Sequence, residues 1–115
     1  MNEFKNHLDE DEFMAIKELI SATKDKYLIE KVILFGSKSR GDYSEHSDVD
    51  LLILTKDKLT PQEQDKFFDI CSFINVDYGV AISCLIINLQ SWLNGENINP
   101  YLKMNVDREG VPIAI

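Results

Sequence analysis

Three separated apolar runs constrain the fold of this chain more than any other feature of its sequence. They cover residues 31–35, 49–55 and 78–87 and read KVILF, VDLLILT and YGVAISCLII. Apolar runs of this length, without regular polar alternation, fit strands that are buried on both faces. Such a sheet needs helices to cover it, so the runs predict a domain of the α/β or α+β class.

The segments between the apolar runs have helical patterns. Residues 11–26 carry apolar side chains at the spacing of one helix face. Thr60-Pro61-Gln62-Glu63 has the composition of a capping box, and the helix that it begins is expected to reach about Ile74. The remaining predicted elements are short helices over 89–93 and 100–108 and an edge strand over 111–115. This order of elements predicts that the helices pack mainly on one face of the sheet.

Size and charge limit the number of domains and the partners. A chain of 115 residues fits a single domain, 1–115, of which the polar residues 1–10 are expected to be frayed. The net charge of −8 argues against extended binding of a nucleic-acid backbone. Residues 1–12 carry five acids and one lysine, unlike a signal peptide, and no apolar run is long enough to span a membrane. The cytoplasm is the expected location.

The first chemical feature is Gly36-Ser37, which follows directly after the first apolar run. A glycine lets the backbone turn sharply there and leaves room for a bulky group. The serine can offer its hydroxyl and its N–H to an anion, and a helix beginning near Ser37 would add free N–H groups. Alone, the pair is more typical of an ordinary turn than of a binding site.

The second feature is Asp48-Val49-Asp50, at the start of the next run. Residues i and i+2 of a strand point the same way, so both carboxylates lie on one face, roughly 6–7 Å apart along the strand. Neighbouring acids raise one another's pKa unless a cation lies between them. Mg²⁺ is commonly held by one or two carboxylates together with waters and substrate phosphates. If the first two strands are neighbours, this pair faces the Gly36-Ser37 turn.

The stretch GSKSRGDYSEHSDVDL, from Gly36 to Leu51, resembles the signature of the minimal nucleotidyltransferases of the DNA polymerase β superfamily. That signature is Gly-Ser, ten residues, then Asp-x-Asp, and it is matched without a gap. The ending REGVPI, over residues 108–113, is also similar to the Glu-Gly-apolar tail of these small proteins. The resemblance implies the nucleotidyltransferase fold, with a small mixed sheet.

The resemblance also implies roles for individual residues. Gly36 and Ser37 would cradle the triphosphate of ATP or another nucleoside triphosphate. Asp48 and Asp50 would bind Mg²⁺ and serve catalysis, and a nucleotidyl group, often AMP, would pass to a hydroxyl. Arg40 would steady a phosphate, with an ion pair to a neighbouring acid as the alternative.

Active members of the family have a third acid on a later strand, which helps to activate the attacking hydroxyl. The corresponding strand is expected at about 76–87, where Asp77, at its start, is the candidate for this catalytic role. In another register the position falls on an apolar residue. General-base assistance is worth roughly 10²–10⁴-fold in rate, so its loss would leave a slow enzyme or a nucleotide-binding subunit.

Short members of the family often depend on a partner for their acceptor. The resemblance implies a small helical protein of the HEPN type, with this chain as an antitoxin that transfers AMP to a tyrosine of the partner toxin. The alternatives are an inactive nucleotide-binding or regulatory subunit of a two-protein complex and, third, an aminoglycoside nucleotidyltransferase. A homo-oligomer is left open.

Overall fold

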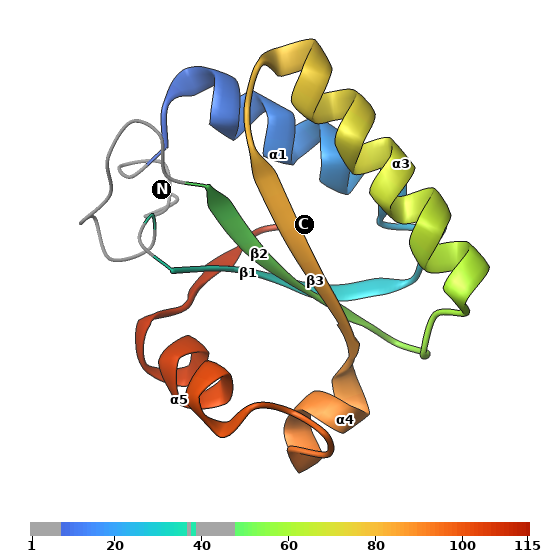
Figure 1. Ribbon diagram of the computed structural model, residues 1–115, viewed down its shortest axis with the longest axis vertical. Coiled ribbons are helices and arrows are strands. Elements are labelled where there is room, and N and C mark those ends of the chain that lie inside the picture. The colour runs from blue at the N-terminus through green and yellow to red at the C-terminus, as the bar shows by residue number, and fades with distance from the viewer. Residues whose placement is uncertain (1–7, 37, 39–47) are drawn as a thin grey trace.

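The computed structural model describes residues 8–36, 38 and 48–115. In this part of the chain, four strands form one sheet and four helices pack against it (Figure 1). The strands are β1 (Ile29–Phe35), β2 (Val49–Thr55), β3 (Ile82–Asn88) and β4 (Val111–Ile113). The helices are α1 (Glu10–Thr23), α3 (Pro61–Tyr78), α4 (Leu89–Asn94) and α5 (Pro100–Glu109).

The sheet is mixed and has the strand order β3-β2-β1-β4. β1 pairs antiparallel with both β2 and β4, whereas β2 and β3 run parallel. Parallel neighbours need a crossover connection, and α3 supplies it between β2 and β3. β4 lies at an edge of the sheet, which is why a strand can contain Pro112 there.

Helices cover both faces of this sheet (Figure 1). The longer helices, α1 with 14 residues and α3 with 18, pack on one face in a core that includes Leu19 and Phe67. The shorter ones, α4 with 6 and α5 with 10, pack on the other face, where Trp92 and Val106 cluster with Leu52. The α/β class and the mixed sheet are confirmed. The sequence did not indicate the second helical layer. In a strand that is buried on both faces, polar and apolar residues do not alternate, so the strand's sequence does not show how the helices are divided between the two faces.

The N-terminal end of α1 is more ordered than the sequence suggested. Leu8 is buried in the core, and Asp9 caps the helix, although both fall in the segment 1–10 that was expected to be frayed. Asp9 and Glu12 form a capping box, in which each side chain accepts a hydrogen bond from the other's backbone N–H. Residues 1–7 lie outside the described part of the chain.

The third predicted strand begins later than expected. The prediction began it at Tyr78, but α3 continues through Tyr78 and β3 begins at Ile82. Ile74 is buried, and Tyr78, one helical turn later, packs on the same core, so the helix gains apolar burial by continuing. Gly79 then ends it in the left-handed conformation. At the other end of α3, the predicted capping box of Thr60 and Glu63 is confirmed.

None of the helices in the described part of the chain has the length and apolar character that a membrane crossing requires. The longest of them, α3, carries the exposed charged residues Asp65, Lys66 and Asp69. The expected cytoplasmic location stays a prediction.

Candidate functional site

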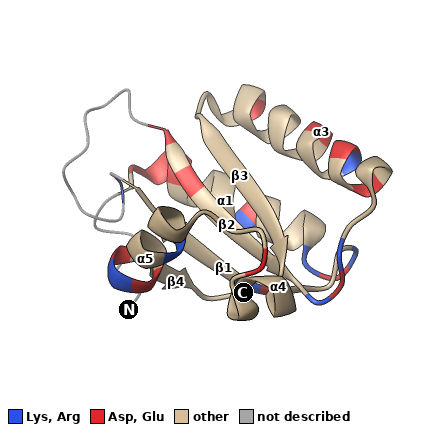
Figure 2. Cartoon of the chain, turned by 60° about the horizontal axis from the view of Figure 1, so that its bottom comes forward, with Lys and Arg blue, Asp and Glu red and all other residues tan. Residues whose placement is uncertain are grey.

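Two carboxylates lie at the start of β2, Asp50 as its second residue and Asp48 directly before it. Asp48 and Asp50 flank Val49, which is fully buried and whose N–H donates to the carbonyl oxygen of Ala81 at 2.9 Å. Because side chains alternate along a strand, the two acids share a face with Leu52, which belongs to the cluster under α4 and α5. The acidic start of β2 is visible in Figure 2. The pair is therefore held by a strand that is fixed in the core.

Gly36 brings the backbone of the chain against this acidic pair. Phe35, the last residue of β1, is the register partner of Asp50, and Gly36 follows it with a φ of +77°. A Cβ atom on Gly36 would lie 2.5 Å from Oδ2 of Asp50. A side chain at this position would therefore be strained and would collide with the carboxylate. The predicted juxtaposition of Gly36 and Asp50 is confirmed.

The surroundings of Asp50 favour a bound cation. Burial raises the pKa of its carboxyl group above the ordinary value, and the negative charge of Asp48 raises it further. The ionised form of such a carboxyl group is destabilised, and a cation beside it would stabilise that form. Two hard oxygen donors on one strand fit Mg²⁺, which commonly takes its other ligands from water and substrate phosphates. Within the described residues, no cluster of three or more His, Cys, Asp or Glu side chains offers a metal a complete protein cage.

The raised pKa of Asp50 predicts that Asp50→Asn stabilises the ligand-free protein. The unfolded chain ionises first as the pH rises, so ionised Asp50 lowers the folding stability progressively until the pH passes its folded pKa. Asparagine removes this cost. Thermal unfolding at neutral pH, without Mg²⁺ or nucleotide, should give a higher midpoint for Asp50→Asn than for the wild type. The difference should vanish below the ordinary carboxyl pKa of 3.8.

The matched variant for this experiment is Asp48→Asn. It removes only the smaller cause of the raised pKa, so its stabilising effect should be smaller than that of Asp50→Asn. An unchanged or lower midpoint for Asp50→Asn at neutral pH would contradict the electrostatic account of this site.

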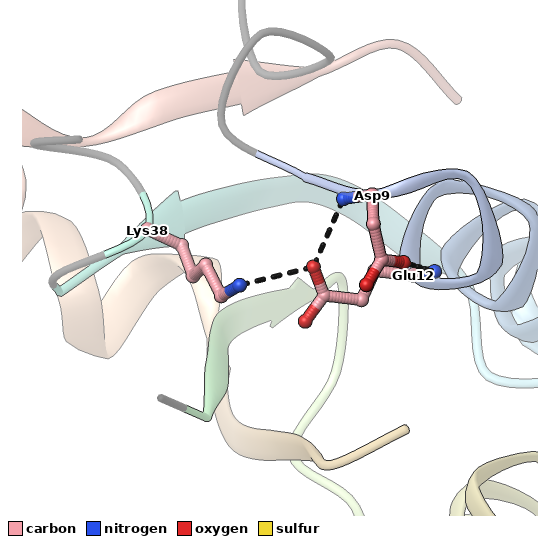
Figure 3. A network of polar contacts seen from close by, with 3 residues as sticks. All are labelled: Asp9, Glu12 and Lys38. Carbon is pink, nitrogen blue, oxygen red and sulfur yellow. Dashed lines mark hydrogen bonds and ion pairs between the residues drawn. The ribbon is translucent and has the colours of Figure 1, made fainter. Parts of the chain in front are cut away.

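A buried ion pair lies next to the Gly36 turn. Nζ of Lys38 lies 3.0 Å from Oε1 of Glu12, and the two side chains are 4% and 8% exposed (Figure 3). The sequence analysis named neither residue as part of the site. The Asp9-x-x-Glu12 pattern is a capping signature, but nothing in a single sequence links position 12 to position 38.

Asp77, the predicted third acid, does not join Asp48 and Asp50. It is exposed in the last turn of α3, a helix that packs on the sheet face opposite to that of Asp50. Its expected place at the entry of the third strand is wrong, because β3 begins only at Ile82. The register partner of Asp50 on β3 is Ser83, which by strand alternation shares its face. β3 itself, ISCLIIN, contains no acid.

Two other predicted site residues, Ser37 and Arg40, lie outside the described residues. Their proposed contacts with phosphate stay predictions from the sequence.

Comparison with known proteins identifies the family. Residues 16–109 match the nucleotidyltransferase domain family. A candidate protein adenylyltransferase of Methanocaldococcus jannaschii is 40% identical over 98 residues, which are 84% of this chain and 91% of that protein. A second candidate protein adenylyltransferase of the same organism is 46% identical over 70 residues, or 61% of this chain and 69% of that protein.

Solved structures share the fold. A candidate minimal nucleotidyltransferase aligns with a TM-score of 0.59 and 24% identity, covering 93% of this chain and 98% of that one. A toxin–antitoxin structure with AMP-PNP aligns with a TM-score of 0.63 and 16% identity, covering 90% of this chain and 72% of that one. These alignments show the shared fold, and the family match together with the sequence relatives shows that the chain belongs to the nucleotidyltransferase domain family.

Proposed function

We propose that this nucleotidyltransferase transfers AMP from ATP to a hydroxyl group of another protein. The observation that carries the proposal is the approach of Gly36 to Asp50, with Asp48 near enough for its charge to raise the pKa of Asp50. A turn without a side chain next to a pair of carboxylates suits a magnesium-bound triphosphate. The choice of AMP and of a protein acceptor follows the relatives from Methanocaldococcus jannaschii, which are named as candidate protein adenylyltransferases.

In the proposed reaction, the acceptor oxygen forms a bond to the α-phosphorus of ATP, the bond to the β-phosphate oxygen breaks, and pyrophosphate leaves. The acceptor loses its proton to water or to a nearby base. Gly36 would admit the phosphates, and Asp48 and Asp50 would hold Mg²⁺. The ion supplies positive charge that offsets the charge developing on the leaving phosphates. Ser37 and Arg40 are proposed phosphate contacts on the basis of the sequence motif.

For the acceptor, we propose a tyrosine hydroxyl on a small helical partner of the HEPN type, with this chain as the antitoxin of the pair. The proposal is supported by the likeness in fold to a protein solved as a toxin–antitoxin with AMP-PNP.

A nucleotide-binding or regulatory subunit with little turnover is the second candidate. It is favoured by one observation, that the neighbour of Asp50 on β3 is Ser83 and not an acid. Without a third carboxylate, general-base help of roughly 10²–10⁴-fold would be missing, whereas nucleotide binding by the first two would remain.

Transfer of a radioactive label from α-³²P-ATP decides between the two candidates. The chain is incubated with Mg²⁺, the labelled ATP and a small helical protein of the HEPN type as the candidate acceptor, and the modified residue is mapped by mass spectrometry. We expect label on a tyrosine of the partner, and none when that tyrosine is replaced by phenylalanine. Binding of ATP without label on any candidate acceptor would overturn the proposed transfer and favour the regulatory subunit.

A further inference from the structure

The Glu12–Lys38 pair differs from the other described ion pairs of this chain in its burial. Its two side chains are 4% and 8% exposed, whereas those of Lys103 and Asp107 are 29% and 60% exposed. Removing two charges from water carries a large free-energy cost, which only close and well-directed contacts offset. A pair of this kind contributes little net stability, so its placement is better explained by the geometry that it imposes.

Glu12 is the rigid member of the pair. Its Oε1 accepts hydrogen bonds both from Nζ of Lys38 at 3.0 Å and from the backbone N–H of Asp9 at 3.1 Å (Figure 3). Its own N–H donates to Oδ1 of Asp9 at 2.8 Å. The next turn of α1 is fixed by Ala15 and Ile16, which are fully buried. The carboxylate of Glu12 is therefore an anchor with a defined position relative to the core.

Lys38 connects this anchor to the candidate site. Gly36 lies against Asp50 at the end of β1, and Lys38 follows it by only two residues. The β1–β2 ladder thus holds the chain up to Gly36, and the contact with Glu12 holds the side chain of Lys38. The contact with Glu12 therefore fixes the side chain of Lys38 relative to α1 and the core.

We propose that Glu12 is a positioning residue, which acts through Lys38 beside the Gly36 turn and so sets the affinity of the site for the phosphates of the nucleotide. The inference rests on the proposed function, since it assumes that the site beside Gly36 receives a nucleoside triphosphate. On this inference, the main partner of the Lys38 ammonium group is Glu12 and not a phosphate of the nucleotide.

The test compares Glu12→Gln, Lys38→Met and the double variant with the wild type. Each single variant removes one charge of the buried pair and leaves the other, whereas the double variant removes both and should fold even if a single variant does not. The matched control is Glu63→Gln, which changes the equivalent capping-box glutamate of α3, in the helix that follows the C-terminal end of β2, whereas Asp48 and Asp50 lie at the start of that strand. The readouts are the Kd for the magnesium complex of AMP-PNP, the thermal midpoint, and amide hydrogen exchange of a peptide spanning residues 35–38.

We expect each single variant to raise the Kd roughly 10-fold or more, as the loss of an orienting contact commonly does. The double variant should regain thermal stability but keep the weakened affinity, and exchange at residues 35–38 should accelerate in all three variants. Glu63→Gln should leave affinity and exchange unchanged.

Two results would overturn the assignment. If the double variant regains affinity together with stability, the pair is only structural. If Lys38→Met weakens binding and Glu12→Gln does not, the lysine itself contacts the phosphates. Failure of AMP transfer in the wild type would count against the proposed function alone, because Kd and exchange are measured without turnover.

Discussion

Asparagine in place of Asp48 or Asp50 is expected to lower the rate of AMP transfer by about 10²–10³-fold. Each substitution keeps the shape of the side chain and removes its negative charge, so the site loses affinity for Mg²⁺ while the fold is retained. Val49, between the two, is fully buried and anchors β2 in either variant. Initial rates of label transfer at saturating ATP, with Mg²⁺ titrated over a wide range, measure the effect and separate weakened metal binding from slower chemistry.

Asp77→Asn is the control for this experiment. It removes the same charge from an exposed position on α3, on the other side of the sheet from Asp50. The rate should stay within about twofold of the wild type, as for a surface change away from the reacting groups. A loss comparable to that in Asp48→Asn would instead support the role of third acid that the sequence suggested for Asp77, and would contradict its distant placement.

Gly36→Ala is the second substitution with a large expected effect. The position has a φ of +77°, and the added methyl group would meet Oδ2 of Asp50 at 2.5 Å. Either the carboxylate or the turn must move, and a displacement of about 1 Å at a reacting centre can cost about 10²-fold in rate. We therefore expect transfer to fall about 10²-fold and the affinity for magnesium-bound AMP-PNP to weaken, as measured by label transfer and calorimetry.

Gly79→Ala separates this steric effect from backbone strain. Gly79 has a φ of +66°, and a Cβ atom there meets nothing within 4 Å. Both alanine variants should lose roughly 1–2 kcal/mol of folding stability, because both force an L-residue into the left-handed region. Only Gly36→Ala should lose activity. Equal activity of the two variants would mean that the close approach of residue 36 to Asp50 does not affect catalysis.

The secondary structure was most predictable where local chemistry decides it. The strand over 49–55 and the capped helix start at Thr60 agree with the structure, because burial and capping depend on residues close together in sequence. The end of α3 was misplaced, because Tyr78 and Val80 are apolar in either a helix or a strand. Their packing on the core, which a local pattern does not contain, decided in favour of the helix and a turn.

For the site, too, local patterns were predictable and contacts between distant segments were not. The sequence by itself determined the family and the common face of the two carboxylates, since the motif is local and side chains alternate along a strand. Only the tertiary structure decided the rest. It paired Phe35 with Asp50, put Asp77 on the far side of the sheet, and joined Glu12 to Lys38. These relations depend on strand register and helix packing between segments distant in sequence, and no local pattern encodes them.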